Sequence, residues 1–238
     1  MSEVVRIAGV ATWTHEAERP EALLLTPRMR GRASLLTGMF ANVALHASRE
    51  ADVDPRALPM IFASAYGEMG TMHTLLEQLH TSGVLSPAKF QASVHNTAAG
   101  QLSIALGNRN FATAIAAGPD TLAMALIEAQ ALLHQHPGHV IVACGDEGAT
   151  AELQPGLTYP PLAAAFVLTN VAGRARARLG ALQPCNEPID PHAAAANPCA
   201  PALALAAAVR SGSRSRLRLN PAAEYGLALE VDATGGEA

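Results

Sequence analysis

Apolar residues along the chain occur in two patterns, short continuous runs and longer stretches that repeat every three or four positions. The short runs predict buried strands, and the longer stretches predict helices. We expect strands at residues 4–13, 58–64, 111–117, 139–144 and 163–169, and helices at residues 29–50, 70–81, 97–106 and 119–135. Residues 87–94 are expected to be a connection. The alternation of strands and helices favours a mixed α/β sheet with helices on both faces.

Residues 111–135, FATAIAAGPDTLAMALIEAQALLHQ, predict a strand, a tight turn and a long buried helix. The run 111–117 is short and apolar, which suits a strand buried on both faces. Gly118 permits the turn, and Pro119 suits a first helical position because its φ is already set and its missing N–H is not needed there. Asp120 is expected to place its carboxylate among the free amides of the first turn.

The character of the sequence changes after residue 180. We therefore divide the chain into residues 1–180 and a C-terminal extension, 181–238, that packs on the same domain. The extension begins with a connection that holds five prolines, Pro184 to Pro201. A short Ala-rich helix, 202–209, and two strands, 217–219 and 227–231, are expected to follow.

Composition indicates a globular protein and gives no reason to expect binding to nucleic acid or to a membrane. Of the 238 residues, 50% are hydrophobic and 15% charged, and the net charge is −4. The locally basic C-terminal third has no interleaved aromatic residues for base stacking, so we interpret its arginines as solvated faces or partner contacts. These arginines are Arg174, Arg176, Arg178, Arg210, Arg214, Arg216 and Arg218.

Cysteine usage and the N-terminal segment point to the cytoplasm. Cys144, Cys185 and Cys199 form no CxxC pair and are odd in number, so neither a disulfide framework nor a zinc site is indicated. The first residues, MSEVVRIAG, lack the features of a signal peptide, and no stretch is apolar enough to span a membrane. We expect no cofactor and no metal.

Three segments together resemble a known family. They are residues 87–133, the run HVIVACGDEG at 139–148 and the run AAAFVLTN at 163–170. In this order they resemble the N-terminal half of β-ketoacyl synthases, the condensing enzymes of fatty-acid and polyketide assembly. The resemblance covers roughly residues 4–170. It implies a thiolase-like layered α-β-α architecture, one half of the usual two-fold repeat, followed by the short C-terminal extension.

The resemblance also shows that the chain departs from the family at the position of the nucleophile. In the family, a cysteine occupies the turn between the strand and the buried helix. Without gaps, this chain has Pro119 at that position, flanked by Gly118 and Asp120. A pyrrolidine ring cannot attack a thioester. We therefore expect no catalytic residue in this chain, and Pro119 marks a degenerate nucleophile position.

A second departure concerns the family's later histidines. The second half of a β-ketoacyl synthase brings two histidines, or a histidine and a lysine, into the active site. After Thr169 the sequence leaves no room for a second βαβ repeat, and the one later histidine is His192 in the proline-rich connection. The decarboxylation and condensation machinery is therefore expected to be absent.

The chain consequently looks closest to the short, nucleophile-less relatives called chain-length factors, found in type II polyketide and aryl-polyene systems. The resemblance implies a heterodimer with a full-length β-ketoacyl-ACP synthase, in which this chain shapes the acyl tunnel and meets acyl carrier protein through the complex. Half of a two-fold repeat also leaves a sheet edge uncovered, which favours association. The interface residues that we expect are Val94, His95, Asn96, Thr97, Gln101, Thr113, Ile115 and Ala117.

Two alternative functions remain. One is a stand-alone module that binds an acyl thioester or acyl carrier protein. The other is a thiol enzyme that uses Cys144, although the residues after it are the carboxylates Asp146 and Glu147 rather than a base. We interpret Cys144 as a small buried residue, and we expect Asp146 and Glu147 to be solvated or to cap a helix.

Overall fold

The structure is a computed structural model that describes residues 4–148, 152, 158–186, 196–222 and 225–235. Helices in these residues are α1 (Pro27–Arg30), α2 (Leu35–Glu50), α3 (Met69–Ser82), α4 (Pro87–Gln91), α5 (Thr97–Leu106), α6 (Thr121–Gln135) and α7 (Ala200–Arg210), with 3₁₀ turns at η1 (Pro55–Ala57) and η2 (Gly118–Asp120). Strands are β1 (Val5–Thr14), β2 (Met60–Ala63), β3 (Ala112–Ile115), β4 (His139–Asp146), β5 (Leu162–Thr169), β6 (Ala177–Leu179), β7 (Gln183–Cys185), β8 (Arg214–Arg218) and β9 (Gly226–Asp232).

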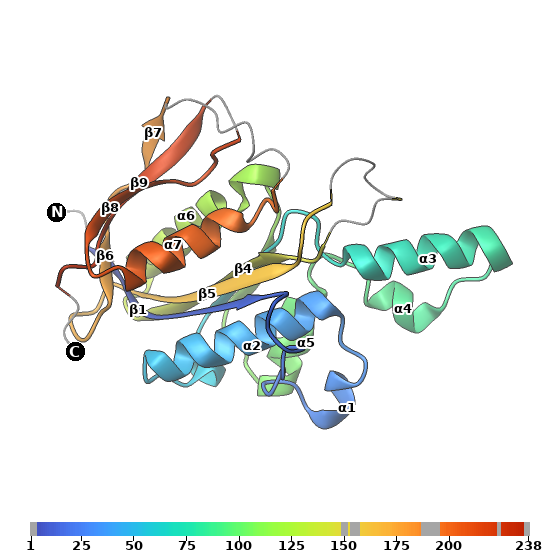
Figure 1. The fold of residues 1–238 in the computed structure, drawn as a ribbon. Helices are drawn as coiled ribbons and strands as arrows, with labels where there is room; N and C mark the ends of the chain where they lie inside the picture. Colours follow the sequence, from blue (N-terminus) through green and yellow to red (C-terminus); the bar gives the residue numbers. More distant parts are fainter. Residues whose placement is uncertain (1–3, 149–151, 153–157, 187–195, 223–224, 236–238) are drawn as a thin grey trace.

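All nine of these strands form one mixed sheet in the order β3-β2-β4-β5-β1-β6-β9-β7, with β8 paired to β9. Strand β2 runs parallel to β3 and β4, whereas β5 runs antiparallel to β4 and β1. Helices α6 and α7 cover one face of the sheet, and α2 and α5 cover the other (Figure 1). The layered α-β-α architecture expected from the sequence is confirmed.

Alternation along the central strands divides the core between the two helical layers. On β4, Val140, Val142 and Cys144 belong to the cluster that includes α6 and α7, whereas Ile141 and Ala143 belong to the cluster that includes α2. Successive side chains of a strand point to opposite faces, so a strand between two helical layers must be apolar throughout. This explains why β4 reads as a continuous apolar run.

Several expected boundaries differ from the structure. The helix expected over 29–50 begins at Leu35, because the Ser34 hydroxyl accepts the Thr37 N–H and caps it there. The expected connection 87–94 contains the short helix α4. Strands β6 and β7 were not expected, since three residues are too few to show a period. Residues 187–195 of the proline-rich connection, with His192, lie outside the described residues.

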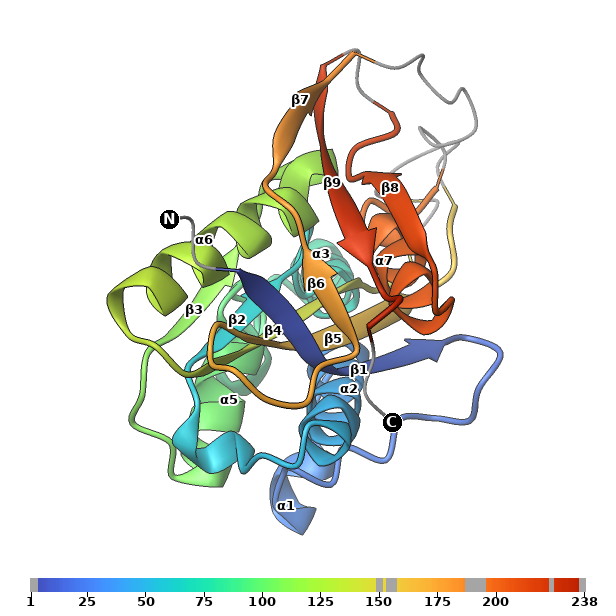
Figure 2. The ribbon, with the colours of Figure 1, turned by 90° about the vertical axis from the view of Figure 1, so that its left-hand side faces the viewer.

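Strand β3 is not buried on both faces, so that expectation is wrong. It lies at one edge of the sheet, with Ala112 exposed and Thr113, Ala114 and Ile115 half-buried (Figure 2). The apolar composition that suggested a central strand is instead found on an edge whose outer side no described strand covers. An apolar run alone cannot distinguish these two positions.

Helices α3 and α4 project from the end of the sheet as an arm (Figure 1). No helix among the described residues has both the length and the apolar character needed to cross a bilayer. The arm exposes several large apolar side chains to solvent, which is unusual for a surface that stays uncovered. These are Met72, Leu76, Leu79, Val84 and Phe90.

We expect Gly9→Ala to destabilise the fold by about 2 kcal/mol or more. A Cβ at Gly9 of β1 would lie 2.2 Å from the backbone oxygen of Ala47, so α2 could not stay against the sheet. Urea unfolding followed by circular dichroism measures the effect. Gly100→Ala on α5 is the control, because a Cβ there meets no heavy atom within 4 Å and alanine favours a helix. Equal stabilities of the two variants would contradict the close approach of α2 to β1.

Candidate functional site

The turn between β3 and α6 contains Pro119, which the sequence resemblance predicts to be the degenerate nucleophile position. Gly118 adopts a left-handed φ of 53°, and Pro119 follows it in the 3₁₀ turn. The Thr121 hydroxyl accepts the N–H of Ala117 and donates to the carbonyl of Gly118, at 3.0 and 2.7 Å. The turn is thus closed by its own hydroxyl, with no reactive group at its tip.

Asp120 does not cap α6 as expected. Its carboxylate accepts a hydrogen bond from the side-chain amide of Asn220, at 2.8 Å, and makes no hydrogen bond to the first turn of the helix. Asn220 lies in the turn between β8 and β9, so this contact joins the C-terminal extension to the start of α6. The backbone of Asp120, at φ −91° and ψ 6°, does not have the extended conformation from which an N-cap side chain accepts the first-turn amides.

A pocket of about 300 Å³ lies beside Pro119. Its walls combine aromatic rings, prolines and two asparagines, contributed by segments far apart in the sequence. Among the described residues, no histidine, lysine or cysteine lines it. The lining includes Tyr66, Tyr159, Asn197, Pro201 and Asn220.

The Asp146 carboxylate lies next to this pocket, at the end of β4. It accepts hydrogen bonds from the Ser64 hydroxyl, from the N–H groups of Ala65 and Tyr66 at 3.0 and 3.1 Å, and from the Cys199 thiol at 3.1 Å. These donors belong to the β2–α3 turn and to the residue before α7. A single buried carboxylate therefore holds two distant segments against the end of β4.

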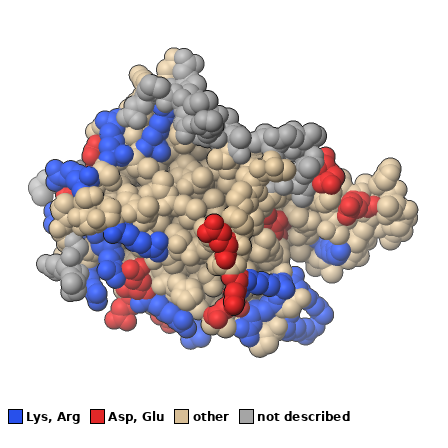
Figure 3. Space-filling model, viewed as in Figure 1, with Lys and Arg blue, Asp and Glu red and all other residues tan. Residues whose placement is uncertain are grey.

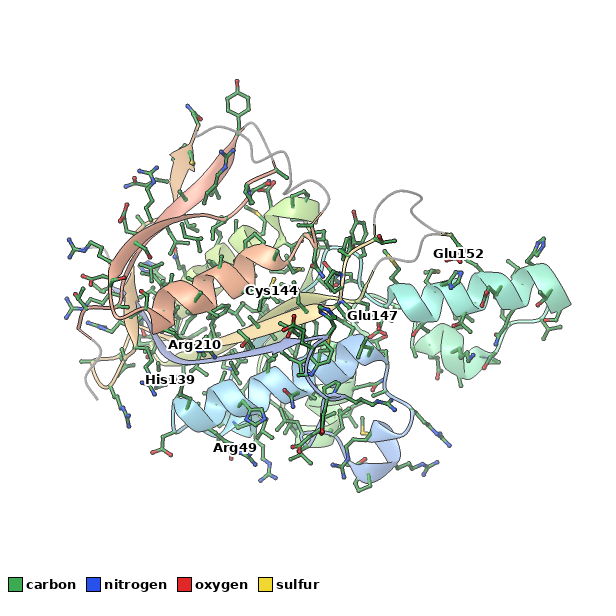
Figure 4. The ribbon with its side chains drawn as sticks, viewed as in Figure 1. Arg49, His139, Cys144, Glu147, Glu152 and Arg210 are labelled. Atoms are coloured by element: carbon green, nitrogen blue, oxygen red, sulfur yellow. The ribbon has the colours of Figure 1, made fainter. Side chains whose placement is uncertain are left out.

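Glu147 likewise holds two distant segments together, on the other side of the sheet. It accepts the N–H of Leu36 at 3.0 Å and the N–H of Gly70 at 2.7 Å, and so caps the first turns of α2 and α3 together. Figure 4 shows Glu147 at the end of the sheet that faces α3. The capping alternative is therefore confirmed for Glu147, whereas solvent exposure was the wrong expectation for both carboxylates, since both are buried.

Glu68, at the start of α3, completes a group of three buried carboxyls. The Thr37 hydroxyl donates to it at 3.0 Å. Burial, with a smaller contribution from the nearby Glu147 carboxylate, raises the pKa of Glu68 from 4.5 to about 7, and hydrogen bonds from Ser34, Thr37 and Thr71 oppose the shift. Burial also raises the pKa of Asp146 and of Glu147, and hydrogen bonds from their donors oppose the shift. The three carboxyls thus titrate above the ordinary carboxyl range.

The thiols lie in the interior. Cys144 and Cys199 are fully buried in the core against α6 and α7, and Figure 4 places Cys144 between the sheet and these helices. Burial, together with the neighbouring Cys144 and Asp146, raises the pKa of the Cys199 thiol well above its ordinary value. A substrate would have no path to either sulfur without opening the core.

A second and larger cavity, a groove of about 1,090 Å³, lies between the arm, the start of α2, and α5. We call it the arm groove. Four of the residues expected at a partner interface line it: Val94, Asn96, Thr97 and Gln101. Asn96 occupies the position before α5, yet its side chain makes no capping hydrogen bond. It is exposed on the groove wall instead.

The remaining residues expected at the interface lie elsewhere. The His95 ring packs against Gly67, and its Nε2 is 2.7 Å from the carbonyl oxygen of Ser64, so His95 secures the β2–α3 turn. Thr113 and Ile115 are on the edge strand β3, and Ala117 follows that strand. Helix α5 contacts β3 and also lines the arm groove, which brings the two sets of residues to neighbouring surfaces.

Arginines of the C-terminal third gather near β6, β8 and β9 (Figure 3). Arg176 forms an ion pair with Glu50 at 3.0 Å, and Arg214 pairs with Asp232 at 2.8 Å. Arg210 donates to the hydroxyl of Thr12 at 3.2 Å. Arg214 therefore holds the extension together, Arg210 joins it to β1, and Arg176 joins the segment before β6 to α2.

Sequence reasoning missed the most connected polar residues of the site, Glu68, Asp146 and Glu147. The available signal was that two adjacent carboxylates directly follow a continuous apolar strand. At the end of such a strand, a residue is less expected to be solvated. Tyr159 and Asn220 gave no signal, because tertiary contacts alone bring them to the pocket. No group of three His, Cys, Asp or Glu side chains in the described part of the chain is arranged to hold a metal ion.

The layered architecture and the strand–turn–helix arrangement define a thiolase-like fold. The chain belongs to the β-ketoacyl synthase N-terminal domain family, whose model matches residues 6–225. Among curated proteins, none matches the sequence.

Solved structures share the fold. One is the ketosynthase ApeO in complex with its chain length factor ApeC from Xenorhabdus doucetiae, at 19% identity over 87% of this chain and 81% of that chain, with a TM-score of 0.65. A second is AntDE:AntF, a type II polyketide synthase acyl-carrier protein in complex with its ketosynthase, at 11% identity over 98% of this chain and 100% of that chain, with a TM-score of 0.76. A third is the ishigamide ketosynthase/chain length factor, at 17% identity over 81% of this chain and 70% of that chain, with a TM-score of 0.59. At these identities the likeness establishes the fold.

We expect Glu68→Gln to reduce the loss of stability that accompanies a rise in pH. The folded carboxyl holds its proton up to about pH 7 and the unfolded one only to about 4.5, so stability from this group is present below 4.5 and is lost as the pH rises through 7. The full loss is about 3 kcal/mol. Urea unfolding at pH 5 and pH 8 measures it. Glu18→Gln, at an exposed position in the loop after β1, is the control and should leave the pH dependence unchanged.

Proposed function

We propose that this chain is a non-catalytic ketosynthase-like subunit of the chain-length-factor type. It pairs with a full-length β-ketoacyl-ACP synthase in fatty-acid or polyketide assembly, and its surface forms part of the partner's acyl tunnel. The observation that carries the proposal is the edge strand β3, which lacks a strand on its outer side among the described residues.

The backbone of β3 is suited to accept another strand. The N–H of Met60 donates to the carbonyl of Phe111, and the N–H of Ser64 donates to that of Ile115. Residues two apart on a strand present their backbone groups to the same side, so those of Ala112 and Ala114 face outward. Exposed edge groups of this kind favour pairing with another chain.

Exposed apolar residues adjoin this edge. Phe111 precedes β3, Ile104 lies on α5, and Val94 lies on the arm side of α5, and each is about half exposed or more. A surface that combines an open strand with neighbouring apolar side chains is typical of an interface. In the proposal, the arm groove is the part of this surface that an acyl chain in the partner's tunnel contacts.

The absence of a nucleophile at Pro119 supports a non-catalytic role. A thiol enzyme that uses Cys144 is less well supported, because that side chain is fully buried. The similar structures include a ketosynthase with its chain length factor and an acyl-carrier protein with its ketosynthase. By analogy, we propose that acyl carrier protein reaches this chain through the complex and that the complex works in the cytoplasm.

Co-expression with a full-length β-ketoacyl-ACP synthase from the same organism is expected to yield a complex with one copy of each chain. Affinity purification through a tag on this chain, followed by light scattering, measures the stoichiometry. A stable monomer that never co-purifies with a ketosynthase, yet binds acyl carrier protein directly, would overturn the proposal in favour of a stand-alone binding module.

Ala114→Pro is expected to abolish co-purification and leave the chain folded. Proline removes the outward N–H of β3, and edge strands tolerate it where that N–H faces solvent. Pull-down yield and circular dichroism measure the two effects. Ala114→Ser keeps the N–H and is the matched control. Undiminished pairing of a folded Ala114→Pro variant would show that β3 is not the contact.

Pro119→Cys is expected not to confer condensing activity on the chain alone. A thiol at this position would face a pocket that has no histidine or lysine among its described lining residues, so nothing would stabilise the carbanion or transfer protons. Product formation from acyl and malonyl carrier-protein thioesters, followed by mass spectrometry, measures it. Condensation by this single variant would contradict the assignment of a non-catalytic subunit.

A further inference from the structure

The arm formed by α3 and α4 is joined to the rest of the molecule mainly at its base. It extends away from the end of the sheet (Figure 1). Leu75 is the one buried residue of α3, and α4 has none. Because little apolar surface is buried along the arm, its position depends on the hydrogen bonds at the start of α3.

Two buried carboxyls accept those hydrogen bonds. Glu147 accepts the N–H of Gly70 at 2.7 Å and the N–H of Leu36 at 3.0 Å, so it links α3 to α2. Glu68, which immediately precedes α3, accepts the hydroxyl of Thr37 at 3.0 Å. Both carboxyls thus hold the base of the arm to the start of α2.

The surroundings of Glu68 disfavour its ionised form. The residue is 2% exposed, and its Oε2 atom has no hydrogen-bond partner in the described structure. Burial disfavours a charge at this position, and the nearby Glu147 carboxylate disfavours a second negative charge, so the pKa of Glu68 is raised to about 7. An ionised Glu68 carboxylate would be more stable in water than in this site.

No positive charge compensates the two carboxyls. The groups that interact with Glu68 come from the start of α2, from α3 and from the end of β4. They are Ser34, Thr37, Thr71 and Glu147. Asp146 adds a further negative charge next to Glu147. Among the described residues, Arg32 and Lys89 line the arm groove beside Glu147, and neither forms an ion pair with it.

Glycines near Glu68 give the base of the arm conformational freedom. Gly67 has a left-handed φ of 66°, a conformation that residues with a Cβ rarely adopt. Gly70 lies in the first turn of α3. Hinges are commonly formed by a few such residues at the end of an element.

We propose that Glu68 and Glu147 form a pH-sensitive hinge at the base of the arm. At low pH the protonated Glu68 stays buried and the arm is docked on the start of α2. As the pH rises, Glu68 releases its proton to solvent, its carboxylate moves into water, and the start of α3 separates from α2. The arm groove, which lies between these elements, opens at the same time.

This hinge goes beyond the proposed function and does not depend on it. All of its parts belong to this chain, whereas the proposed contact with a ketosynthase uses β3. Failure to co-purify would leave the pH response intact, and absence of a pH response would leave pairing through β3 intact.

Hydrogen–deuterium exchange of the purified full-length chain at pH 6 and pH 8, corrected for the intrinsic exchange rate, tests the proposal. We expect the amides of α3 to exchange about tenfold faster at pH 8, because the pKa of Glu68 is about 7 when the arm is docked and 4.5 when it is released. Equal protection of α3 at the two pH values would overturn the proposal.

Low concentrations of urea separate release of the arm from global unfolding. Exchange through a local opening is nearly insensitive to urea, whereas exchange through global unfolding accelerates. We therefore expect the exchange of α3 at pH 8 to change little with urea while that of β4 rises. Exchange of α3 that rises with urea as steeply as that of β4 would contradict a hinge.

Glu68→Gln separates this carboxyl from nearby histidines, which change charge near neutral pH. The histidines on α3 or beside the β2–α3 turn are His73, His80 and His95. Glutamine has the same size but does not ionise, so we expect equal protection of α3 at pH 6 and pH 8. Glu18→Gln, at an exposed position in the loop after β1, is the control and should keep the tenfold response. A response that persists in Glu68→Gln would assign it to a histidine and overturn the proposal.

Thr37→Val tests whether the response follows the charge on Glu68 rather than the packing of the hinge. The Thr37 hydroxyl lowers the pKa of Glu68, so without it the pH at which the exchange rate of α3 levels off should rise by about 0.5 or more. Thr37→Ser keeps the hydroxyl and should leave that pH unchanged. An unchanged or lower value in Thr37→Val would overturn the role of Glu68.

Discussion

The buried Asp146 carboxylate is the interaction on which the arrangement of the site depends. A carboxylate removed from water is costly unless donors replace its hydration. Here a hydroxyl, two backbone amides and a thiol do so, and they come from the β2–α3 turn and from the residue before α7. Because losing any one donor would leave the carboxylate poorly satisfied, the two segments are held in one position relative to β4.

Adjacent residues on a strand point to opposite faces, and this alternation explains how one strand end supports two cavities. Asp146 organises the face covered by α7, where the pocket beside Pro119 lies. Glu147 organises the face covered by α2 and joins that helix to the arm. The pocket and the arm groove are thus separate spaces supported by neighbouring residues.

The two sides of the sheet are built differently. On one side, strands β6 to β9 extend the sheet, and Arg176 and Arg210 hold this region through Glu50 and Thr12. On the other side, the sheet stops at β3, and Phe111 before this strand and Ile104 on the contacting helix α5 are exposed. An open edge beside exposed apolar side chains is suited to association.

The sequence alone determined the order of the longer strands and helices, the two helical layers and the place of Pro119, because apolar period and turn residues are local properties. Only the tertiary structure decided that β3 is an edge, that Asp146 and Glu147 are buried, and that Tyr159 and Asn220 meet in one pocket. Each of these depends on contacts between residues far apart in the chain. An apolar strand reads the same at the centre or the edge of a sheet, and a carboxylate reads as solvated until its donors are known.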